Sequence, residues 1–328
     1  MKRKQKRQKE LFGAILIILM IVFVYSGVQI LGSTVFFTQE TQTTYRTSKT
    51  ITRDGVDYFP RQDMTVLMVM GIDQEGKVQD SGSYNNPGAA DAVMLMVFTE
   101  NDKKVRVLTL NRDTMVEMPV LGVGGKPAGT VEAQLALAHT YGDGLEESCK
   151  NVKDTVSNLL YGLDIDYYVS ANMDAIAILN DAVGGVPVTV TEDFSAIDPT
   201  ITMGEITLRG KQATNYVRSR SGVGDELNVS RMERQKDYID GFMKALKNSA
   251  KTDSSFILKT YEDTVDYMVT DCSSTVWNSM LNKYQEYTLE EVVSPKGENV
   301  VGEEFMEYYL DEEALDELVL RLFYAPKK

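Results

Sequence analysis

Apolar residues occur along this chain either in short dense runs or at helical spacing, and the two patterns alternate. The short runs are rich in Val, Met and Leu and are bounded by Gly, Asp or Asn, which predicts buried strands. They lie at Thr65–Met70, Ala92–Thr99, Val105–Leu110, Tyr167–Ser170 and Val186–Thr191. Helical spacing covers residues 131–141, 146–161, 173–183, 211–219, 230–248, 254–267, 274–284 and 312–323. Strands interleaved with helices predict a layered α/β or α+β domain.

The longest apolar stretch lies near the N-terminus, where residues 11–32 form a run of 22 residues. A helix needs about 20 such residues to cross a bilayer. Six lysines and arginines precede the run and no charged residue follows it before Glu40, so the basic end is expected in the cytoplasm. We see no convincing signal-peptide cleavage site. We therefore expect a cytoplasmic tail (1–10) and an uncleaved signal-anchor in the cell membrane (11–32).

The composition changes after this span. Residues 33–62 are polar, rich in Thr, Gln and Arg and without a clear period, which predicts an extracytoplasmic stalk. The chain as a whole is 43% hydrophobic and 25% charged, as globular proteins are, and residues 63–328 are numerous enough for one sizeable core. We expect one extracytoplasmic domain over residues 63–328.

Charge singles out one region of that domain. After position 10 the chain has 28 basic against 47 acidic residues, yet four arginines fall within 17 positions, at Arg218, Arg220, Arg231 and Arg234. Arginine presents a planar fork of donors that suits phosphate oxygens, so the cluster indicates an anionic ligand. Surface arginines paired with acidic neighbours would leave the same pattern. Nucleic acid is not an expected partner, because the domain lacks an overall basic character.

Other chemistries are disfavoured by the residues present. The only histidine, His139, lies in an apolar helical pattern, which indicates a buried or rim histidine rather than a catalytic or metal-binding one. There is no Gly-x-Ser-x-Gly elbow, and residues 122–126 lack the spacing and the Ser or Thr of a P-loop. Two cysteines, Cys149 and Cys272, are too few and too distant in sequence for a zinc site of their own.

Seven segments together resemble the LytR–CpsA–Psr family, from about Met64 to the C-terminus. In order, they are MVMGID ending at Asp73, ADAVMLMV with Asp91, VLTLNRDTMVEMP with Arg112 and Asp113, LALAHTYGDG, LNDAVGGVPVTV, LRGKQATNYVRSR and SRMERQ. Their order and spacing carry the match. Members of this family transfer a glycopolymer, such as a teichoic acid or capsular polysaccharide, from an undecaprenyl-pyrophosphate carrier to peptidoglycan. The resemblance implies that activity here, and with it a single three-layer α-β-α domain around a central mixed sheet.

The resemblance also implies a set of site residues. Arg112, Arg218, Arg220, Arg231 and Gln235 match positions that bind the pyrophosphate, and Asp73 and Asp91 match the acids that bind Mg²⁺ or Mn²⁺. Such a metal prefers hard oxygen ligands, typically one or two carboxylates together with phosphates and water. Each of these Asp residues taken alone could equally be a turn residue at a strand end.

Two positions depart from the family pattern. The family's proposed base is an Asp where this chain has Asn228, which cannot accept a proton. Asp225, a phosphate oxygen of the substrate or Asp113 could replace it, and Asp225 is our choice. The family's Lys-x-Asn motif is replaced by Gln134-Leu135-Ala136, which removes a polar contact that the sequence does not assign.

The substitution at Asn228 keeps a second function open, that of a non-catalytic, membrane-anchored protein that binds the polyprenyl-phosphate carrier or attenuates a signal. Regulation of transcription in the cytoplasm is disfavoured by the expected topology. A last expectation concerns Cys149 and Cys272, which lie at predicted element ends in an oxidising compartment, so we favour a disulfide between them over two unrelated buried thiols.

Overall fold

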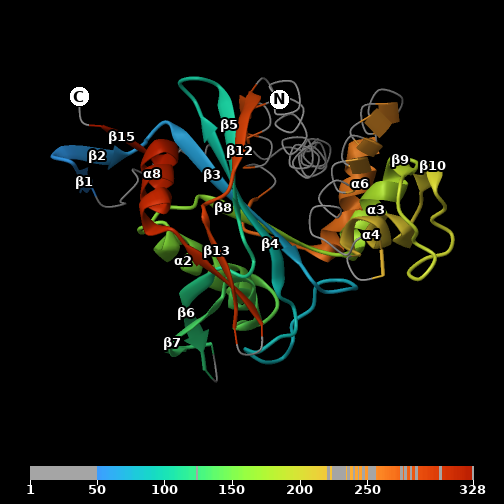
Figure 1. The fold of residues 1–328 in the computed structure, drawn as a ribbon, viewed down its shortest axis with the longest axis horizontal. Coiled ribbons are helices and arrows are strands. Elements are labelled where there is room, and N and C mark those ends of the chain that lie inside the picture. Colours follow the sequence, from blue (N-terminus) through green and yellow to red (C-terminus); the bar gives the residue numbers. More distant parts are fainter. Residues whose placement is uncertain are drawn as a thin grey trace, which may run out of the picture.

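The computed structural model describes most of the chain from residue 50 onward (Figure 1). The described residues are 50–122, 125–219, 222–223, 234, 237–238, 241–242, 244–245, 248–249, 256–273, 276, 279–280, 283–284, 287–302 and 305–326. Among these residues, no helix is both long enough and apolar enough to cross a membrane. The expected signal-anchor, residues 11–32, lies outside the described part of the chain and stays a prediction.

A six-stranded mixed sheet forms the centre of the molecule, in the order β11-β8-β3-β4-β5-β12 (Figure 1). Its strands are β3 (Met64–Ile72), β4 (Ala90–Thr99), β5 (Lys104–Leu110), β8 (Tyr167–Asn172), β11 (Met268–Thr270) and β12 (Thr288–Val293). β3 runs parallel to β8 and β5 runs parallel to β12, whereas the remaining neighbours are antiparallel. The predicted α/β fold with a central mixed sheet is confirmed.

Helical residues cover both faces of this sheet. The helices are α2 (Glu146–Leu159), α3 (Asp174–Ala182), α4 (Lys211–Arg218), α6 (Phe256–Thr264) and α8 (Glu312–Phe323), with 3₁₀ helices η1 (Leu135–Thr140) and η2 (Val265–Tyr267). Because side chains alternate along a strand, Val66 and Met68 of β3 pack in a core cluster with α2 and α8, while Leu67 faces the other side. There it shares a cluster with Met280 and Tyr284, two residues in helical conformation.

A second core lies at one end of the molecule, away from the main sheet. It joins α3 and α4 to the two-stranded sheet of β9 (Val186–Val190) and β10 (Gly204–Leu208). Figure 1 shows these four elements grouped on the right, with α6 beside them. This group matters for function because α4 carries the first of the clustered arginines at its C-terminal residue, Arg218.

Several predictions from the pattern are wrong. The helix expected over 131–141 is the end of β7 (Pro127–Gln134) followed by η1, and β7 pairs with β6 (Met115–Leu121). The stalk expected over 33–62 contains β1 (Ile51–Arg53) and β2 (Val56–Pro60). β2 pairs with β15 (Tyr324–Pro326) at the other end of the chain, so ordered structure begins earlier than position 63. These strands are short or carry polar residues between their apolar ones, so they form no dense apolar run, which is why the pattern missed them.

The expected disulfide is also wrong, because Cys149 and Cys272 are both free thiols. Cys149 is on α2 and packs on one face of the sheet, whereas Cys272 belongs to the core cluster on the opposite face. The sheet itself therefore separates the two sulfur atoms. Burial raises the pKa of each thiol to about 12, so both behave as small buried apolar groups.

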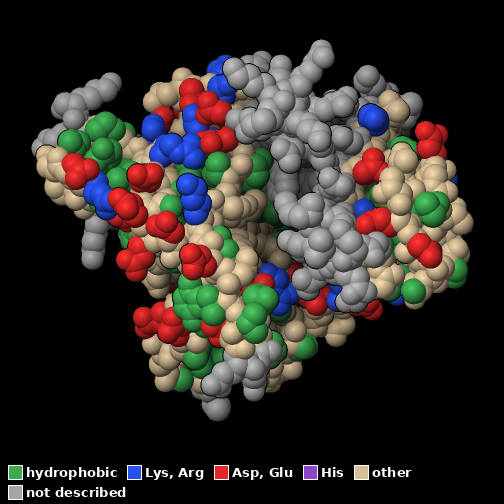
Figure 2. Space-filling model, in the orientation of Figure 1, with side chains coloured by type: hydrophobic (Ala, Val, Ile, Leu, Met, Phe, Trp, Pro, Cys, Tyr) green, Lys and Arg blue, Asp and Glu red, His purple; other side chains and the backbone are tan. Residues whose placement is uncertain are grey.

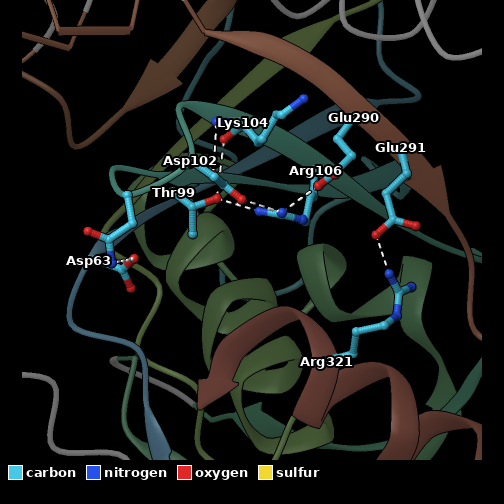
Figure 3. Close-up of polar contacts among 9 residues, drawn as sticks. Asp63, Thr99, Asp102, Lys104, Arg106, Glu290, Glu291 and Arg321 are labelled. Carbon is cyan, nitrogen blue, oxygen red and sulfur yellow. Dashed lines mark hydrogen bonds and ion pairs between the residues drawn. The ribbon is translucent and has the colours of Figure 1, made fainter.

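Ion pairs fasten β12 and α8 to the edge of the sheet (Figure 3). Arg106 of β5 pairs with Asp102 at 2.5 Å and with Glu290 of β12, and Arg321 of α8 pairs with Glu291. An open cavity of about 450 Å³ lies among these residues. Basic and acidic side chains are interspersed on this face (Figure 2), and each of these two arginines has a carboxylate partner, so we interpret the network as structural.

Candidate functional site

Three residues of the expected site, Asp73, Asp91 and Arg112, lie at one edge of the central sheet. Asp73 directly follows β3, Asp91 is the second residue of β4, and Arg112 lies two residues after β5. Because β4 is antiparallel to both of its neighbours, the end of β3, the start of β4 and the end of β5 meet at the same edge. The ion-pair network of Arg106 and Asp102 lies at the opposite edge, where β4 ends and β5 begins.

A β-bulge positions Asp91. In the pairing of β3 with β4, Gly71 lies opposite Ala92 and Ile72 lies opposite Ala90, so Asp91 is an extra residue in the ladder. A bulge of this kind bends the strand and redirects a side chain. The backbone N–H of Asp73 donates to the carbonyl of Ala89 at 2.8 Å, which holds the two acidic segments together.

Two ion pairs join the acids to arginines from distant parts of the chain. Arg112 donates to Asp91, and Arg218 at the end of α4 donates to Asp73. The structure therefore brings together two carboxylates and two guanidinium groups, all partly exposed: 29% for Asp91, 34% for Arg112, 34% for Asp73 and 47% for Arg218. We call these four residues the arginine–carboxylate cluster.

The two acids of the cluster are close enough for the charge of Asp73 to affect the pKa of Asp91. Partial burial raises the pKa of Asp91, the Arg112 guanidinium opposes this shift, and the charge of Asp73 adds to it. The charge of Asp73 is therefore close enough to raise the pKa of Asp91, and a cation is favoured beside two such neighbouring carboxylates.

Asp113 lies beside this cluster in the loop after β5. Its Oδ1 atom is 3.4 Å from Arg112 Nε and accepts a hydrogen bond from Gln134 Nε2 at 3.1 Å. Gln134 Nε2 also donates to the carbonyl of Met306 at 2.7 Å. The residue that departs from the family pattern thus ties Asp113 to β14 (Met306–Leu310), which pairs with β13 (Gly297–Val301). Arg112 Nε is buried and makes no hydrogen bond with any described residue, and the carboxylate of Asp113 is the charged group beside it.

His139 and Asn86 anchor the loop that leads into β4. His139 is 1% exposed, and its Nδ1–H donates to the carbonyl of Gly88 at 2.7 Å. Asn86 donates to the carbonyls of His139 and Gly142 at 2.8 and 3.0 Å and accepts from the N–H of Gly88 at 2.9 Å. Of the two expected positions for this histidine, buried or at a rim, the structure shows the buried one. Its contact with the loop before Asp91 could not be predicted, because His139 and Gly88 are 51 residues apart.

This buried histidine predicts a specific pH dependence of stability. Burial lowers the pKa of His139 from 6.5 to about 4, so between these values the unfolded chain binds more protons than the folded one. The stabilisation is complete above pH 6.5 and is lost as the pH falls towards 4, by on the order of 3 kcal/mol. Unfolding free energies measured from pH 4 to 7 test this. We expect the slope to shrink in His139→Asn, whose amide can still donate to Gly88, and an unchanged slope would contradict the assignment.

Several expected site residues lie outside the described part of the chain. They are Arg220, Asp225, Arg231 and Gln235, together with the departure at Asn228. Their roles stay predictions. Arg234, from the same segment, is described and is buried at 4% exposure, so it does not belong to the exposed cluster.

Asp73 and Asp91 are the residues of the cluster that could hold a metal ion. No group of three or more acidic, His or Cys side chains in the described residues could do so. Two carboxylates alone match the habit of Mg²⁺, which keeps several waters and takes further oxygen ligands from substrate phosphates. The donor set therefore fits a metal that binds together with a phosphate ligand.

A protein-family model described as the LytR_cpsA_psr family matches residues 32–322. The chain belongs to this family. Among its relatives, the polyisoprenyl-teichoic acid–peptidoglycan teichoic acid transferase TagU of Enterococcus faecalis is 28% identical over 270 residues, 76% of this chain and 80% of that protein. TagU of Bacillus subtilis is 28% identical over 214 residues, 65% of this chain and 62% of that protein.

A solved structure shares the fold of this LytR_cpsA_psr protein. The crystal structure of TagV from Bacillus subtilis matches it with a TM-score of 0.57 at 22% identity, over 80% of this chain and 96% of that chain. The arginine–carboxylate cluster lies on the segments by which this chain resembles the family: MVMGID, ADAVMLMV, VLTLNRDTMVEMP and LRGKQATNYVRSR.

Proposed function

We propose that this chain is a membrane-anchored phosphotransferase that moves a glycopolymer from a polyprenyl-pyrophosphate carrier to peptidoglycan. The observation that carries the proposal is the arginine–carboxylate cluster, in which two arginines and two acids meet at one sheet edge. Relatives named as teichoic acid transferases, at 28% identity, support the same reaction class. Teichoic acid or a capsular-type polysaccharide is the glycopolymer that we propose.

The arginines suit a pyrophosphate. Arg112 and Arg218 are paired with Asp91 and Asp73 and are still partly exposed. A pyrophosphate carries several anionic oxygens, and a guanidinium can bind two of them at once. Phosphoryl transfer requires mainly positioning and neutralisation of charge, which these groups provide.

In the proposed reaction, a hydroxyl oxygen of peptidoglycan attacks the phosphorus that carries the glycopolymer. A new P–O bond forms to the acceptor, the P–O bond to the carrier's other phosphate breaks, and the polyprenyl phosphate leaves with the electron pair. The hydroxyl proton passes to a base on the enzyme or to a phosphate oxygen. Arg112 and Arg218 stabilise the negative charge on the phosphates throughout.

Asp73 and Asp91 would hold one Mg²⁺ or Mn²⁺ next to the phosphates. When bound, such an ion neutralises charge that develops on the phosphate oxygens. The same two carboxylates would then release Arg112 and Arg218 from their ion pairs. Metal binding by the carboxylates frees the arginines for the pyrophosphate, and the pyrophosphate supplies further oxygen ligands for the metal. We therefore expect metal and pyrophosphate to bind cooperatively.

We further propose that the domain works at the outer face of the cell membrane, next to the carrier lipid. The basis is the apolar run at 11–32 with six basic residues before it. A single-pass anchor would keep the cluster near a substrate whose tail lies in the bilayer.

The proposal is tested by reconstituting the full chain in lipid vesicles with a polyprenyl-pyrophosphate-linked teichoic acid, isolated peptidoglycan and Mg²⁺. We expect the polymer to become covalently attached to the peptidoglycan and polyprenyl phosphate to be released. Tight binding of the carrier without any transfer would instead support the non-catalytic binding or attenuator function that the Asn228 substitution leaves open.

The identity of the base gives a separate prediction. Asp225 is the choice from the sequence, whereas Asp113 is the carboxylate that lies beside Arg112 in addition to the proposed metal ligand Asp91. Replacing the true base by Asn should lower the transfer rate by about 10²-fold or more. We expect that loss in Asp225→Asn, with Asn228→Asp active at least as strongly as the wild type. A normal rate in Asp225→Asn and a loss in Asp113→Asn would assign the role to Asp113.

A further inference from the structure

Arg234 is a buried arginine in which each of the three guanidinium nitrogens contacts an acceptor on the protein. Its side chain is 5% exposed and pairs with Glu192, itself only 16% exposed. Nε donates to the carbonyl of Tyr216 at 3.2 Å, and an Nη–H donates to the carbonyl of Ser219. The guanidinium also lies over the ring of Phe194, 5.4 Å from its centroid. At this exposure, and with all three nitrogens in contact with the protein, Arg234 is not accessible to a substrate phosphate.

The two carbonyls that Arg234 binds flank Arg218. Tyr216 is two residues before it in α4, and Ser219 follows it in extended conformation, with φ −62° and ψ 134°. Helix carbonyls at a C-terminal end lack partners within the helix, and a positive charge is favoured there. α4 has no glycine after its last residue, so Arg234 takes the place of the usual C-terminal cap.

The segment that carries Arg234 also holds the side chain of Tyr216. The hydroxyl of Tyr216 donates to Asp237 Oδ2 at 3.3 Å, and the same carboxylate oxygen accepts from the N–H of Thr189 at 2.7 Å. The ring of Tyr216 stacks on Phe194 with centroids 5.5 Å apart. Tyr216 is thus fixed at its backbone by Arg234 and at its hydroxyl by Asp237, three residues further on.

We propose that Arg234 is a positioning residue that orients the C-terminal end of α4 so that Arg218 points at Asp73 and, in the complex, at the pyrophosphate. This role rests on the proposed function, because it acts through the ligand contact of Arg218. A lone arginine on a short helix end would have many orientations. Because Arg234 donates to the carbonyls of Tyr216 and Ser219, on both sides of Arg218, it restricts the backbone there to one orientation. That restriction lowers the conformational entropy lost when Arg218 binds a ligand.

The test measures binding of geranylgeranyl pyrophosphate with Mg²⁺ to the full chain by isothermal titration calorimetry, in a double-mutant cycle. Lysine keeps the charge but cannot donate to Glu192 and both carbonyls, so Arg234→Lys should weaken binding about tenfold. In an Arg218→Ala background the same change should alter the affinity less than about twofold, because the residue through which it acts is gone.

Two further variants test whether a loss of binding comes from the missing contacts of Arg234 or from a damaged fold. Removing one partner of a buried ion pair can unfold a protein, so Arg234→Met is combined with Glu192→Gln, which leaves no buried charge. This double variant should fold and bind about tenfold more weakly than the wild type. Arg321→Lys, which alters an ion pair at the opposite sheet edge, is the control and should bind normally.

The outcomes separate this inference from the function on which it rests. Equal losses from Arg234→Lys in both backgrounds would show a general effect on the fold and overturn the positioning role. Unchanged binding in Arg234→Lys and in the double variant, with a clear loss in Arg218→Ala, would overturn only the role of Arg234. Unchanged binding in Arg218→Ala would overturn the pyrophosphate site itself, and the positioning role with it.

Discussion

Arg218→Ala is expected to abolish transfer and to weaken the binding of a polyprenyl pyrophosphate about 10- to 100-fold. The physical reason is the loss of charge-assisted contacts to the phosphate, each worth about 1.5–3 kcal/mol. The fold should persist, because Arg218 is 47% exposed and its partner Asp73, at 34%, can be hydrated once the arginine is gone. Transfer assays and calorimetry with geranylgeranyl pyrophosphate measure the two effects, and the thermal unfolding midpoint checks the fold.

A matched control for this experiment is Arg321→Ala. Arg321 also makes one ion pair with a carboxylate, Glu291, and it is 50% exposed, but it lies in the structural network that joins α8 to β12. Its replacement should leave both transfer and lipid binding near the wild-type values. Equal losses in the two variants would mean that removal of any surface arginine is harmful, and normal binding in Arg218→Ala would contradict the site.

Asp91→Asn is expected to uncouple metal from pyrophosphate. Asp91 neutralises Arg112, so pyrophosphate binding without metal has to break that ion pair. An amide at this position releases Arg112 and is a poor metal ligand. We therefore expect metal-free pyrophosphate binding at least as tight as in the wild type and a Mg²⁺ enhancement of less than about twofold, with transfer lowered about 10²-fold or more.

Calorimetric titrations with pyrophosphate lipid, with and without Mg²⁺, measure this coupling directly. Asp102→Asn is the control, because Asp102 neutralises Arg106 in the same manner at the opposite edge of the sheet. The control should retain the full effect of Mg²⁺. If Asp91→Asn also retains it, then Asp91 is a turn residue that pairs with Arg112 and has no role in metal binding.

The sequence was most informative where a residue's environment depends on its near neighbours in the chain. The dense apolar run at Thr65–Met70 predicted β3 because a strand buried on both faces needs apolar side chains at every position. The expected helix over 146–161 matches α2 within two residues at its end, since one face of that helix is apolar. The positions of Asp73 and Arg112 just after predicted strands also followed from these runs.

Contacts between distant segments were decided by the tertiary structure alone. Arg218 and Asp73 are 145 residues apart, and no local pattern indicates which carboxylate an arginine on α4 will meet. The bulge that presents Asp91 depends on the register between two strands, which apolar spacing does not specify to one residue. Arg234 gave the same signal in sequence as Arg218, yet it is buried, because it lies where the carbonyls at the end of α4 need a donor.

By itself, then, the sequence determined four of the six central strands (β3, β4, β5 and β8), the excess of acidic residues around an arginine cluster, and the apolar run at 11–32, all of which are properties of neighbouring residues. Only the tertiary structure decided which arginines and acids form one site. It also separated Cys149 from Cys272, since the two faces of one sheet look alike in sequence but hold their side chains apart. Alternation of side chains along a strand can be read from the sequence, but what each face of the sheet contacts depends on tertiary packing.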